Sequence, residues 1–414
     1  MESPSLSPVI VWLRRDLRLD DNLVLSAAVR RGGPVIPLFI LEVPTSLPNA
    51  SRWWLDRSLK ELQREFCVRR SRLILRTGDA VKVLTELVKE TNAGDVFWDK
   101  SFEPEQRRVD TRIRKSLAVL GVSCQEFNDG FLFDPEKLRT KQGTPFKVFT
   151  PFWKGCLSLG EPLAPVKAPI RLRAPSLWPR SEKLKDPGDG VSPKWRANLG
   201  SFWRPGARGA SRCLTSFLRS EIERYSEGRD HPARDGTSRL SPYLHFGEIS
   251  VRRVWREVRK NMVRVHRSGN IRASEAFLRQ LVWREFAAGL LYHFPGTVEA
   301  PFRGAFSEFM WKQDPKAFRA WQQGKTGYPI VDAGMRQLLA TGWMHNRVRM
   351  IVASFLVKDL LIDWKKGAAW FNEMLIDADL ANNTFGWQWV AGCGADAAPY
   401  FRIFNPVLQG GKFD

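Results

Sequence analysis

The chain has 414 residues, 43% of them hydrophobic, and its 65 Lys and Arg outweigh 44 Asp and Glu to give a formal net charge of +21. This length predicts two domains or three, and the hydrophobic content allows a large buried core. Such an excess of positive charge attracts polyanions, so nucleic acid is the favoured partner and an anionic membrane is the alternative. A merely solvated basic surface is disfavoured because solubility requires far less charge. No apolar run approaches the ~20 residues of a membrane span, so no membrane-embedded function is expected.

The five cysteines are scattered, and no two of them have CxxC spacing: Cys67, Cys124, Cys156, Cys213 and Cys393. An odd, unpatterned set disfavours a disulfide framework and a zinc site, so we expect no bound metal. Unpaired thiols, together with a first segment that lacks the pattern of a signal peptide, predict a cytoplasmic protein.

The first part of the chain alternates short apolar runs with helix-length amphipathic segments. The apolar runs are Val9–Leu13, Val35–Leu41, Leu73–Leu75, Val96–Trp98 and, more weakly, Cys124–Phe127. The helical segments between them include Trp53–Phe66 and Ala80–Lys89. This alternation predicts an α/β domain over residues 1–132 with a doubly wound, Rossmann-like parallel sheet. No GxGxxG motif follows the first run, so the usual dinucleotide fingerprint of that fold is absent.

Residues 133–210 are rich in Pro, Gly, Ser and basic residues, especially over Pro162–Pro179 and Asp186–Pro193. Their composition and length predict an interdomain connector that runs over the surface. Residues 211–414 show helical periods over Arg212–Tyr225, Ser274–Tyr292, Asp332–Thr341, Arg347–Leu361 and Ala368–Leu375. The second domain is therefore predicted to be all-α.

The segment Gly236–Pro242, with the sequence GTSRLSP, concentrates hydroxyl groups at a predicted helix start. Ser241 would cap the helix and Pro242 would take its first position. Hydroxyls and backbone N–H groups at the positive end of a helix make an anion site, although an ordinary capped helix has the same pattern.

Two sets of residues have the spacing of a single helix face: Gln280, Trp283, Arg284 and Ala287, and then Trp343, Asn346, Arg347 and Met350. Aromatic, amide and guanidinium groups on one face suit a cavity that stacks a flat base and binds its polar edge. An ordinary helix–helix interface is an equal alternative for each set taken alone.

A further polar segment, Asp377–Asn383, places carboxylates beside amides, and Trp387 and Trp389 follow about one helical turn later. Carboxylates and amides in this arrangement can bind the polar edge of a heterocycle. A loop with Asx caps is the alternative interpretation.

Several longer motifs carry a resemblance that covers nearly the whole chain. They are Trp12–Arg18 with Asp21 and Asn22, then Gly236–Gly247, Lys325–Asp332, Thr341–Arg347 and Gly394–Pro406. Together these segments resemble the photolyase/cryptochrome family. The resemblance implies an N-terminal α/β antenna domain and an all-α domain that holds FAD in a U shape.

The resemblance also assigns residues to the cofactor. Its phosphates would be held by Tyr225, Thr237, Ser238, Arg239, Leu240 and Ser241. Gln280, Arg284, Trp343 and Asn346 would surround it, Arg349 and Asp377 would pair near its ring, and Asp379 would meet the polar edge of the ring. Asn383 would face the flavin N5, where a neutral amide is compatible with an anionic reduced flavin. Plant cryptochromes carry a carboxylate at the matching position, so Asn383 favours a repair enzyme.

The implied activity is the light-driven splitting of cyclobutane pyrimidine dimers in DNA, a carbon–carbon lyase reaction on a flipped lesion. Trp283 and Trp389 would be the stacking walls of the substrate cavity, and Gln280, Asn346, Arg347 and Met350 would complete it. Trp311, Trp364 and Trp387 match the family's tryptophan chain for electron transfer to the flavin.

Particular residues favour one branch of the family. Asn346 follows His345 where enzymes for (6-4) lesions have a second histidine, which favours cyclobutane dimers. Gln280 stands where many cyclobutane photolyases have glutamate, and Thr384–Phe385 with Gly392–Gly394 indicates the branch related to plant cryptochromes, class III. A cryptochrome photoreceptor, a (6-4) photolyase and a plain basic DNA-binding protein are the alternatives.

A second, antenna chromophore is expected in the N-terminal domain, near Glu103, Glu105 and the Trp12–Arg18 turn. Methenyltetrahydrofolate is the first choice, with 8-hydroxydeazaflavin and a second flavin as alternatives. Nothing in the sequence indicates an oligomer interface, so we expect a monomer.

Overall fold

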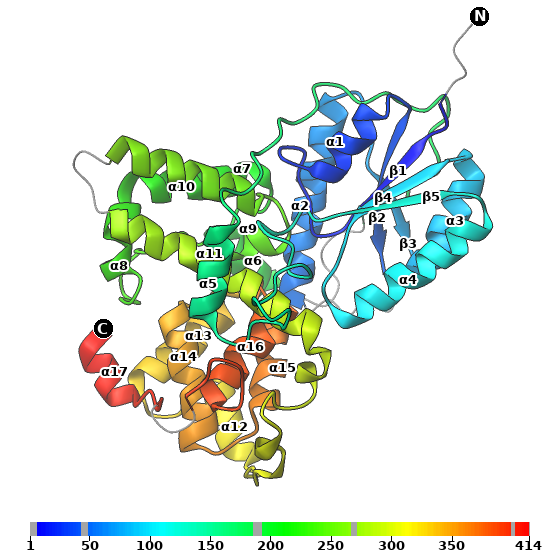
Figure 1. Ribbon diagram of the computed structural model, residues 1–414. Helices are drawn as coiled ribbons and strands as arrows, with labels where there is room; N and C mark the ends of the chain where they lie inside the picture. The colour runs from blue at the N-terminus through cyan, green and yellow to red at the C-terminus, as the bar shows by residue number, and fades with distance from the viewer. Residues whose placement is uncertain (1–5, 43–48, 185–192, 266–270, 399–401, 414) are drawn as a thin grey trace, which may run out of the picture.

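Five parallel strands form one sheet in the first third of the chain. The structure, a computed structural model, describes residues 6–42, 49–184, 193–265, 271–398 and 402–413 (Figure 1). The strands are β1 (Val9–Leu13), β2 (Val35–Leu41), β3 (Ile74–Thr77), β4 (Asp95–Asp99) and β5 (Ser123–Phe127). Their order in the sheet is β3-β2-β1-β4-β5, so the chain winds to one side of β1 and then to the other. The predicted doubly wound parallel sheet is confirmed.

Helices cover both faces of this sheet: α1 (Leu23–Arg30), α2 (Asn49–Val68), α3 (Ala80–Thr91) and α4 (Pro104–Val119). Side-chain caps fix where two of them begin, because Asn22 accepts from the Leu25 N–H and Asp79 from the Lys82 N–H. Every residue of β1 is buried, as expected for the central strand of a sheet covered on both faces.

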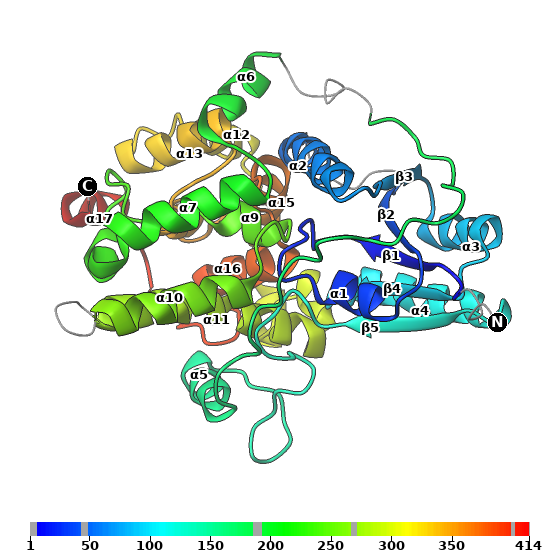
Figure 2. The same ribbon diagram turned by 90° about the horizontal axis from the view of Figure 1, so that it is seen from above.

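The connector is more structured than predicted. It contains α5 (Phe149–Ser158), which packs against α11 (Ile271–His293), and α6 (Pro193–Phe202), which packs against α13 (Pro329–Thr341). Between them the chain runs past the α/β unit before it returns to the helical part (Figure 2). Most of the Pro-rich stretch Asp186–Pro193 lies outside the described residues, and the boundaries at 132 and 210 stay a prediction.

The rest of the chain is helical, as predicted. Its helices are α7 (Ala207–Ser220), α8 (Tyr225–Gly228), α9 (Ser241–His245), α10 (Val251–Val265), α11 (Ile271–His293), α12 (Pro315–Gln322), α13 (Pro329–Thr341), α14 (Asn346–Ser354), α15 (Trp364–Met374), α16 (Leu380–Ala391) and α17 (Pro406–Phe413). Two predicted helices are interrupted: a 3-10 turn at Ile222–Arg224 separates α7 from α8, and a π-helical turn at Phe355–Asp359 ends α14. Leu361, with a φ of 55°, then reverses the chain.

One hydrophobic cluster runs from the sheet into the helical part. It joins Leu13 of β1 and Trp54 of α2 to Tyr243 and Phe246. The Trp54 ring stacks on Phe246 with 6.0 Å between centroids and meets Tyr243 edge-on at 5.0 Å. The two parts therefore share a core instead of meeting through a polar surface.

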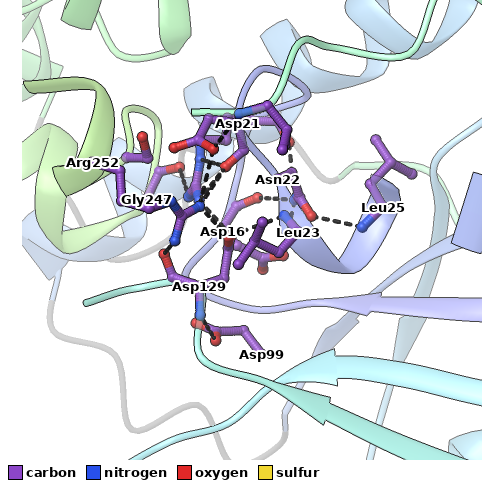
Figure 3. A network of polar contacts seen from close by, with 12 residues as sticks. Asp16, Asp21, Asn22, Leu23, Leu25, Asp99, Asp129, Gly247 and Arg252 are labelled. Carbon is purple, nitrogen blue, oxygen red and sulfur yellow. Dashed lines mark hydrogen bonds and ion pairs between the residues drawn. The ribbon is translucent and has the colours of Figure 1, made fainter. Parts of the chain in front are cut away.

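A buried ionic network reinforces this joint (Figure 3). The Asp129 carboxylate lies between the guanidinium groups of Arg18 and Arg252, with 2.7 Å from Arg252 Nη2 to Asp129 Oδ1. Arg252 also pairs with Asp21 at 3.1 Å, and Arg18 donates to the Gly247 carbonyl at 2.9 Å. The four charged side chains are at most 2% exposed. Arg252 belongs to the first turn of α10, so this network connects the α/β unit directly to the helical part.

We expect Asp129→Asn to lower the free energy of unfolding by about 3–5 kcal/mol, because two buried guanidinium groups lose their shared counter-charge. The matched control is Glu105→Gln, which breaks an ion pair with Arg108 whose side chains are 73% and 76% exposed. That control should lose less than about 1 kcal/mol. Urea denaturation measures both, and equal losses in the two variants would contradict the role given to Asp129.

Candidate active site

Three packed helices carry ten of the predicted site residues. α11 presents Gln280, Trp283 and Arg284, α14 presents Asn346, Arg347, Arg349 and Met350, and α16 presents Asn383, Trp387 and Trp389. Both α11 and α14 pack against α16. Trp343 differs from the prediction, because it lies in the linker between α13 and α14 and not on the helical face of Asn346.

The loop before α9 brings the predicted phosphate-binding residues together. A Cβ on Gly236 would lie 2.6 Å from the Gly228 carbonyl oxygen, so this glycine lets the loop lie against α8, which begins at Tyr225. Arg239 has a φ of 50°, and Ser238 Oγ accepts from the Leu240 N–H at 3.3 Å. The Arg239 guanidinium lies over the Trp343 ring, 5.5 Å from its centroid, and its buried Nε has no hydrogen-bond partner in the part of the chain that the structure describes.

The predicted cap of α9 is wrong. Leu240 is the N-cap residue, with a helical φ of −82° and ψ of −8°, and Ser241 is already the first residue of the helix. The Ser241 hydroxyl does not cap because it accepts from Trp343 Nε1 at 3.4 Å. Ser241 therefore ties the loop to the linker that carries Trp343.

The predicted ion pair between Arg349 and Asp377 is present. Arg349 Nη2 lies 2.8 and 3.0 Å from the two Asp377 oxygens, and Arg349 Nε donates to the Met344 carbonyl. The Asp377 side chain is only 3% exposed. This pair fixes the segment that leads into α16.

Asp379 is the N-cap of α16, where its carboxylate accepts from Asn382 N at 2.9 Å. Asp379 therefore caps the helix, as the alternative interpretation of this segment expected, and it is also the residue that the family resemblance assigns to the flavin ring. One turn later, Asn383 Nδ2 donates to the Ala368 carbonyl at 2.9 Å. Because the amide nitrogen is occupied, the amide oxygen of Asn383 is the atom left to accept from a ligand.

Charged groups from both parts of the protein surround Asp379. Arg15 Nη1 lies 2.5 Å from Glu103 Oε1 and 3.5 Å from Asp379 Oδ2, and His245 Nδ1 lies 3.9 Å from that oxygen. Burial is the largest single influence on Asp379 and opposes its ionisation, but Arg15 and the other favourable charges and hydrogen bonds around it together lower its pKa. Burial and Arg15 together lower the pKa of His245 to about 3, so this histidine is neutral at physiological pH. Two buried atoms, His245 Nδ1 and Arg284 Nη1, have no hydrogen-bond partner among the described residues.

These groups line a cavity of about 270 Å³ between the sheet and the helical part. Leu13, Leu41 and Asp99 place it at the carboxyl ends of β1, β2 and β4. This is the edge at which doubly wound sheets bind ligands, next to the switch point between β1 and β4. Of the two glutamates expected near an antenna chromophore, Glu103 lines the cavity, whereas Glu105 pairs with Arg108 on the surface at 3.0 Å.

The two predicted stacking tryptophans lie in different surroundings. Trp283 is half-buried and stacks face to face on Phe149 of α5, with 3.5 Å between centroids and 7° between planes. Trp389 packs on Phe404, and the Arg402 guanidinium lies over it at 4.1 Å. Sequence reasoning missed Phe149 because it lies in the connector, although the apolar run around it was a signal.

The other predicted substrate-cavity residues, on α11 and α14, have partners within the protein. Arg347 Nη2 pairs with Asp230 at 2.6 Å, and Gln280 Nε2 donates to the Ala276 carbonyl at 3.2 Å. Asn346 is exposed, and its amide nitrogen lies 3.9 Å from the sulfur of Met350. Burial lowers the pKa of the neighbouring His345 to about 4, which keeps it neutral.

The three predicted electron carriers follow a gradient of burial. Trp387 is 2% exposed and Trp364 is 3% exposed, whereas Trp311 is only partly buried. The ring contacts of Trp387 within the described part of the chain are with Phe371, at 5.0 Å, and Trp321, at 6.2 Å. Trp321 is fully buried, and sequence reasoning did not single it out.

Comparison with known proteins identifies the family. Residues 9–170 match the family model for DNA photolyase, and residues 277–414 match that for the FAD binding domain of DNA photolyase. The deoxyribodipyrimidine photo-lyase of Agrobacterium fabrum is 48% identical over 413 residues, which is 99% of this chain and 85% of that protein. Cryptochrome-1 of Arabidopsis thaliana is 38% identical over 98% of this chain and 61% of its own length.

Solved structures agree. A bacterial class III photolyase from Agrobacterium tumefaciens matches with a TM-score of 0.95 and 46% identity, over 100% of this chain and 85% of that one. An archaeal photolyase from Sulfolobus tokodaii, solved with two FAD molecules, matches with a TM-score of 0.82 and 31% identity, over 98% and 87%. The chain belongs to the photolyase/cryptochrome family. The predicted family, and the predicted combination of an α/β and an all-α part, are confirmed.

The residues of the site fit FAD. Donors without partners at Arg239 Nε and Arg284 Nη1 suit phosphate and ring oxygens, and the Asn383 oxygen and the Asp379 carboxylate supply acceptors. In contrast, the described residues include no group of three or more His, Cys, Asp or Glu side chains arranged to hold a metal ion. Nor does any helix within the described ranges combine the length and apolar character of a membrane span.

We expect Arg15→Gln to make FAD binding more sensitive to acid. Loss of the guanidinium removes the main cause of the lowered pKa of Asp379, so the carboxylate becomes protonated at a higher pH than in the wild type. Stabilisation that depends on the charge of Asp379 is present above that pKa and is lost as the pH falls through it.

The recovery of free FAD fluorescence during acid titration measures this effect. The midpoint should move to higher pH in Arg15→Gln and stay unchanged in Arg108→Gln, which removes an exposed guanidinium from α4. An identical midpoint in all three proteins would contradict the coupling between Arg15 and Asp379.

Proposed function

We propose that this protein is a deoxyribodipyrimidine photolyase, a repair enzyme that splits cyclobutane pyrimidine dimers in DNA with FAD and light. The polar cluster of Arg349–Asp377, Asp379 and Asn383 carries the proposal, because it lies within the matched FAD-binding domain and offers the groups that a flavin ring needs. Bound FAD, once reduced and excited by light, would supply the one electron that opens the cyclobutane ring, and this electron would return to the flavin afterwards.

The protein's own residues bind, orient and exclude water. Tyr225, Thr237, Ser238, Leu240 and Ser241 lie in or beside the loop proposed to hold the phosphates, and Arg239 adds a guanidinium there. The amide nitrogen of Asn383 donates to the Ala368 carbonyl, so its oxygen would be free to accept from the N5 of a bound flavin, and the neutral amide would not repel an anionic ring. Trp283, Trp389 and Met350 provide apolar surface for the flipped dimer, while Gln280, Asn346 and Arg347 surround its polar edges.

Two observations favour dimer repair over the alternatives. The Asn383 amide argues against a cryptochrome-type photoreceptor, because the family resemblance implies a carboxylate at this position in plant cryptochromes. His345 is followed by the exposed Asn346 and not by a second histidine, which argues against a (6-4) photolyase. The wild-type Gln280 can donate a hydrogen bond to a dimer carbonyl but cannot donate a proton.

The interdomain cavity is our proposed antenna site. Its position at the carboxyl ends of the strands and its lining by Arg15, Glu103 and Phe102 suit a flat, partly anionic chromophore. Methenyltetrahydrofolate remains the first choice, with a deazaflavin or a second flavin as alternatives. Release of bound chromophores by denaturation, followed by chromatography and absorption spectroscopy, distinguishes the three.

We propose a monomer that acts on DNA in the cytoplasm. Exposed large hydrophobic side chains such as Val68, Val119, Ile170 and Met310 belong to different segments of the chain. Phosphate contacts should dominate DNA affinity, so binding should weaken steeply with salt.

The proposal is tested by repair under blue light. The reduced, FAD-loaded protein is mixed with a thymine-dimer oligonucleotide, and the recovery of thymine absorbance is followed with a dark control. Recovery that depends on light supports the proposed enzyme. No recovery from a protein that holds FAD and binds the oligonucleotide would reject cyclobutane repair and direct the test to (6-4) lesions.

Trp283→Ala should weaken binding of the dimer oligonucleotide by about 1–3 kcal/mol, the usual contribution of one base–aromatic stack. Trp178→Ala is the control, because Trp178 packs against the core of the α/β unit. Fluorescence anisotropy measures binding and flavin absorbance reports whether FAD is retained. An unchanged affinity in a Trp283→Ala protein that retains FAD would remove Trp283 from the substrate site.

Trp387→Phe should slow light-driven reduction of the oxidised protein at least tenfold while leaving repair by the chemically reduced protein nearly intact. Phenylalanine keeps the packing against Phe371 and Trp321 but is a much poorer electron donor. Flavin absorbance under blue light follows the reduction. Normal photoreduction in this variant would show that electrons take another route, for which Trp321 is the first residue to test.

A further inference from the structure

Three arginine-bearing segments meet at the edge of the sheet opposite the interdomain cavity. They are the turn after α1, with the sequence VRRGG (29–33), the turn after α2, VRRSR (68–72), and the connector stretch IRLR (170–173). Turns that precede parallel strands lie at the amino edge of the sheet, which brings the first two together. The connector is held there because the Val35 N–H donates to the Arg173 carbonyl and Arg69 Nε donates to the Pro169 carbonyl.

Between these segments lies a hollow of about 610 Å³, which we call the arginine hollow. It is lined by Val29, Gly32, Gly33, Val35, Arg70, Arg171, Leu172, Arg173 and Ala174. Three of these lining residues are arginines, and none of those in the described part of the chain carries a carboxylate. Such an arrangement attracts anions and has no internal partner to neutralise it.

The arginines of this edge differ in how far they are already engaged. Arg31 pairs with Asp95 at 2.6 Å, and Arg173 Nη1 donates to the Gly32 carbonyl at 3.2 Å. Arg70 and Arg171 have no ion pair and no side-chain hydrogen bond within the described part of the chain. Their donors are therefore available to a ligand.

The backbone of Arg70 is a further sign of function. Its φ of 57° lies in the left-handed region, where the end of a helix usually has glycine. A long charged residue at this position is strained, and strain of this kind is common where a side chain must point toward a ligand. Hydrogen bonds from Arg70 N to Cys67 O and from Ser71 N to Phe66 O hold the turn in place.

We propose that the arginine hollow binds phosphate groups of a nucleic-acid backbone, at a site separate from the flavin and substrate site. Guanidinium forks match phosphate oxygens bidentately, and contacts to the backbone require no particular base sequence. The concave shape favours a strand that enters the hollow over the flat surface of an anionic bilayer.

The arginine hollow and the interdomain cavity, our proposed antenna site, lie at opposite ends of the same strand. Val35, the first residue of β2, lines the arginine hollow, and Leu41, its last residue, lines the interdomain cavity. A strand of seven residues spans about 20 Å, so one nucleotide cannot occupy both. The hollow adds a second phosphate contact to the proposed contacts at the active site, which should strengthen binding to long nucleic acid more than to short.

The test uses the full chain with the double substitution Arg70→Gln/Arg171→Gln. Arg108→Gln/Arg112→Gln is the control, because it removes the same charge from exposed positions of α4. Fluorescence anisotropy with an undamaged 40-base-pair duplex, over a range of salt concentrations, should show affinity reduced about tenfold. The slope of log affinity against log salt should fall by about 2, close to one unit for each lost phosphate contact. Circular dichroism and thermal melting should match the wild type.

Each result decides the proposal. Weaker duplex binding and a smaller salt slope in the hollow variant but not in the control support it. Equal losses in both variants overturn it, because they reflect net charge alone. Unchanged duplex binding with lost binding to phosphatidylserine vesicles also overturns it and assigns the hollow to a lipid surface.

Repair of a short dimer oligonucleotide separates this site from the proposed enzyme activity. That repair should be unchanged in the hollow variant, because the active-site residues are intact. If neither the variant nor the wild type repairs dimers, the proposed function fails while the duplex measurements still decide the arginine hollow.

Discussion

The Asp129 carboxylate, held between Arg18 and Arg252, is the interaction on which the rest of the structure depends. Arg18 follows β1, Asp129 follows β5, and Arg252 belongs to the first turn of α10. A buried charge without a partner is so unfavourable that these three segments have one stable arrangement. The interdomain cavity is lined by Arg15 and Glu103 from one part and by His245 and Asp379 from the other, so its geometry depends on that arrangement.

The residues of the opening motif, Trp12–Arg18, have two different roles. Arg14 and Arg15 line the cavity, whereas Asp16 and Arg18 are fully buried and work inside the protein. Asp16 Oδ1 accepts from the Arg14 N–H at 2.8 Å, so the interior residue fixes the turn that presents the cavity residues. Half of the motif therefore serves the domain joint, and only the other half can meet a ligand.

How far the sequence predicts this protein depends on the range of the interactions. The bounds of β1 and β2 are correct because each is one uninterrupted apolar run. The cap at Ser241 is wrong because its hydroxyl binds Trp343, more than a hundred residues later. Trp343 has helical spacing from Asn346 by coincidence, since Gly342, with a φ of 66°, has already ended α13. The Phe149–Trp283 stack joins two segments that no local pattern relates.

The net charge of +21 makes physical sense once the arginines are sorted by their surroundings. Arg18 and Arg252 are buried, and carboxylates balance their charges. They therefore hold neighbouring segments in place and add little to the electrostatic potential outside the protein. Arg284 is half-buried beside the cavity with an unpartnered donor, and such a group is specific for whatever ligand reaches it. Arg70 and Arg171 lie at the opposite edge without counter-charge, where they act at long range on any polyanion. Arginines thus have three roles in this protein: they hold the domains together, bind a ligand or attract a polyanion. Which role each one has depends on how much of its charge neighbouring carboxylates balance.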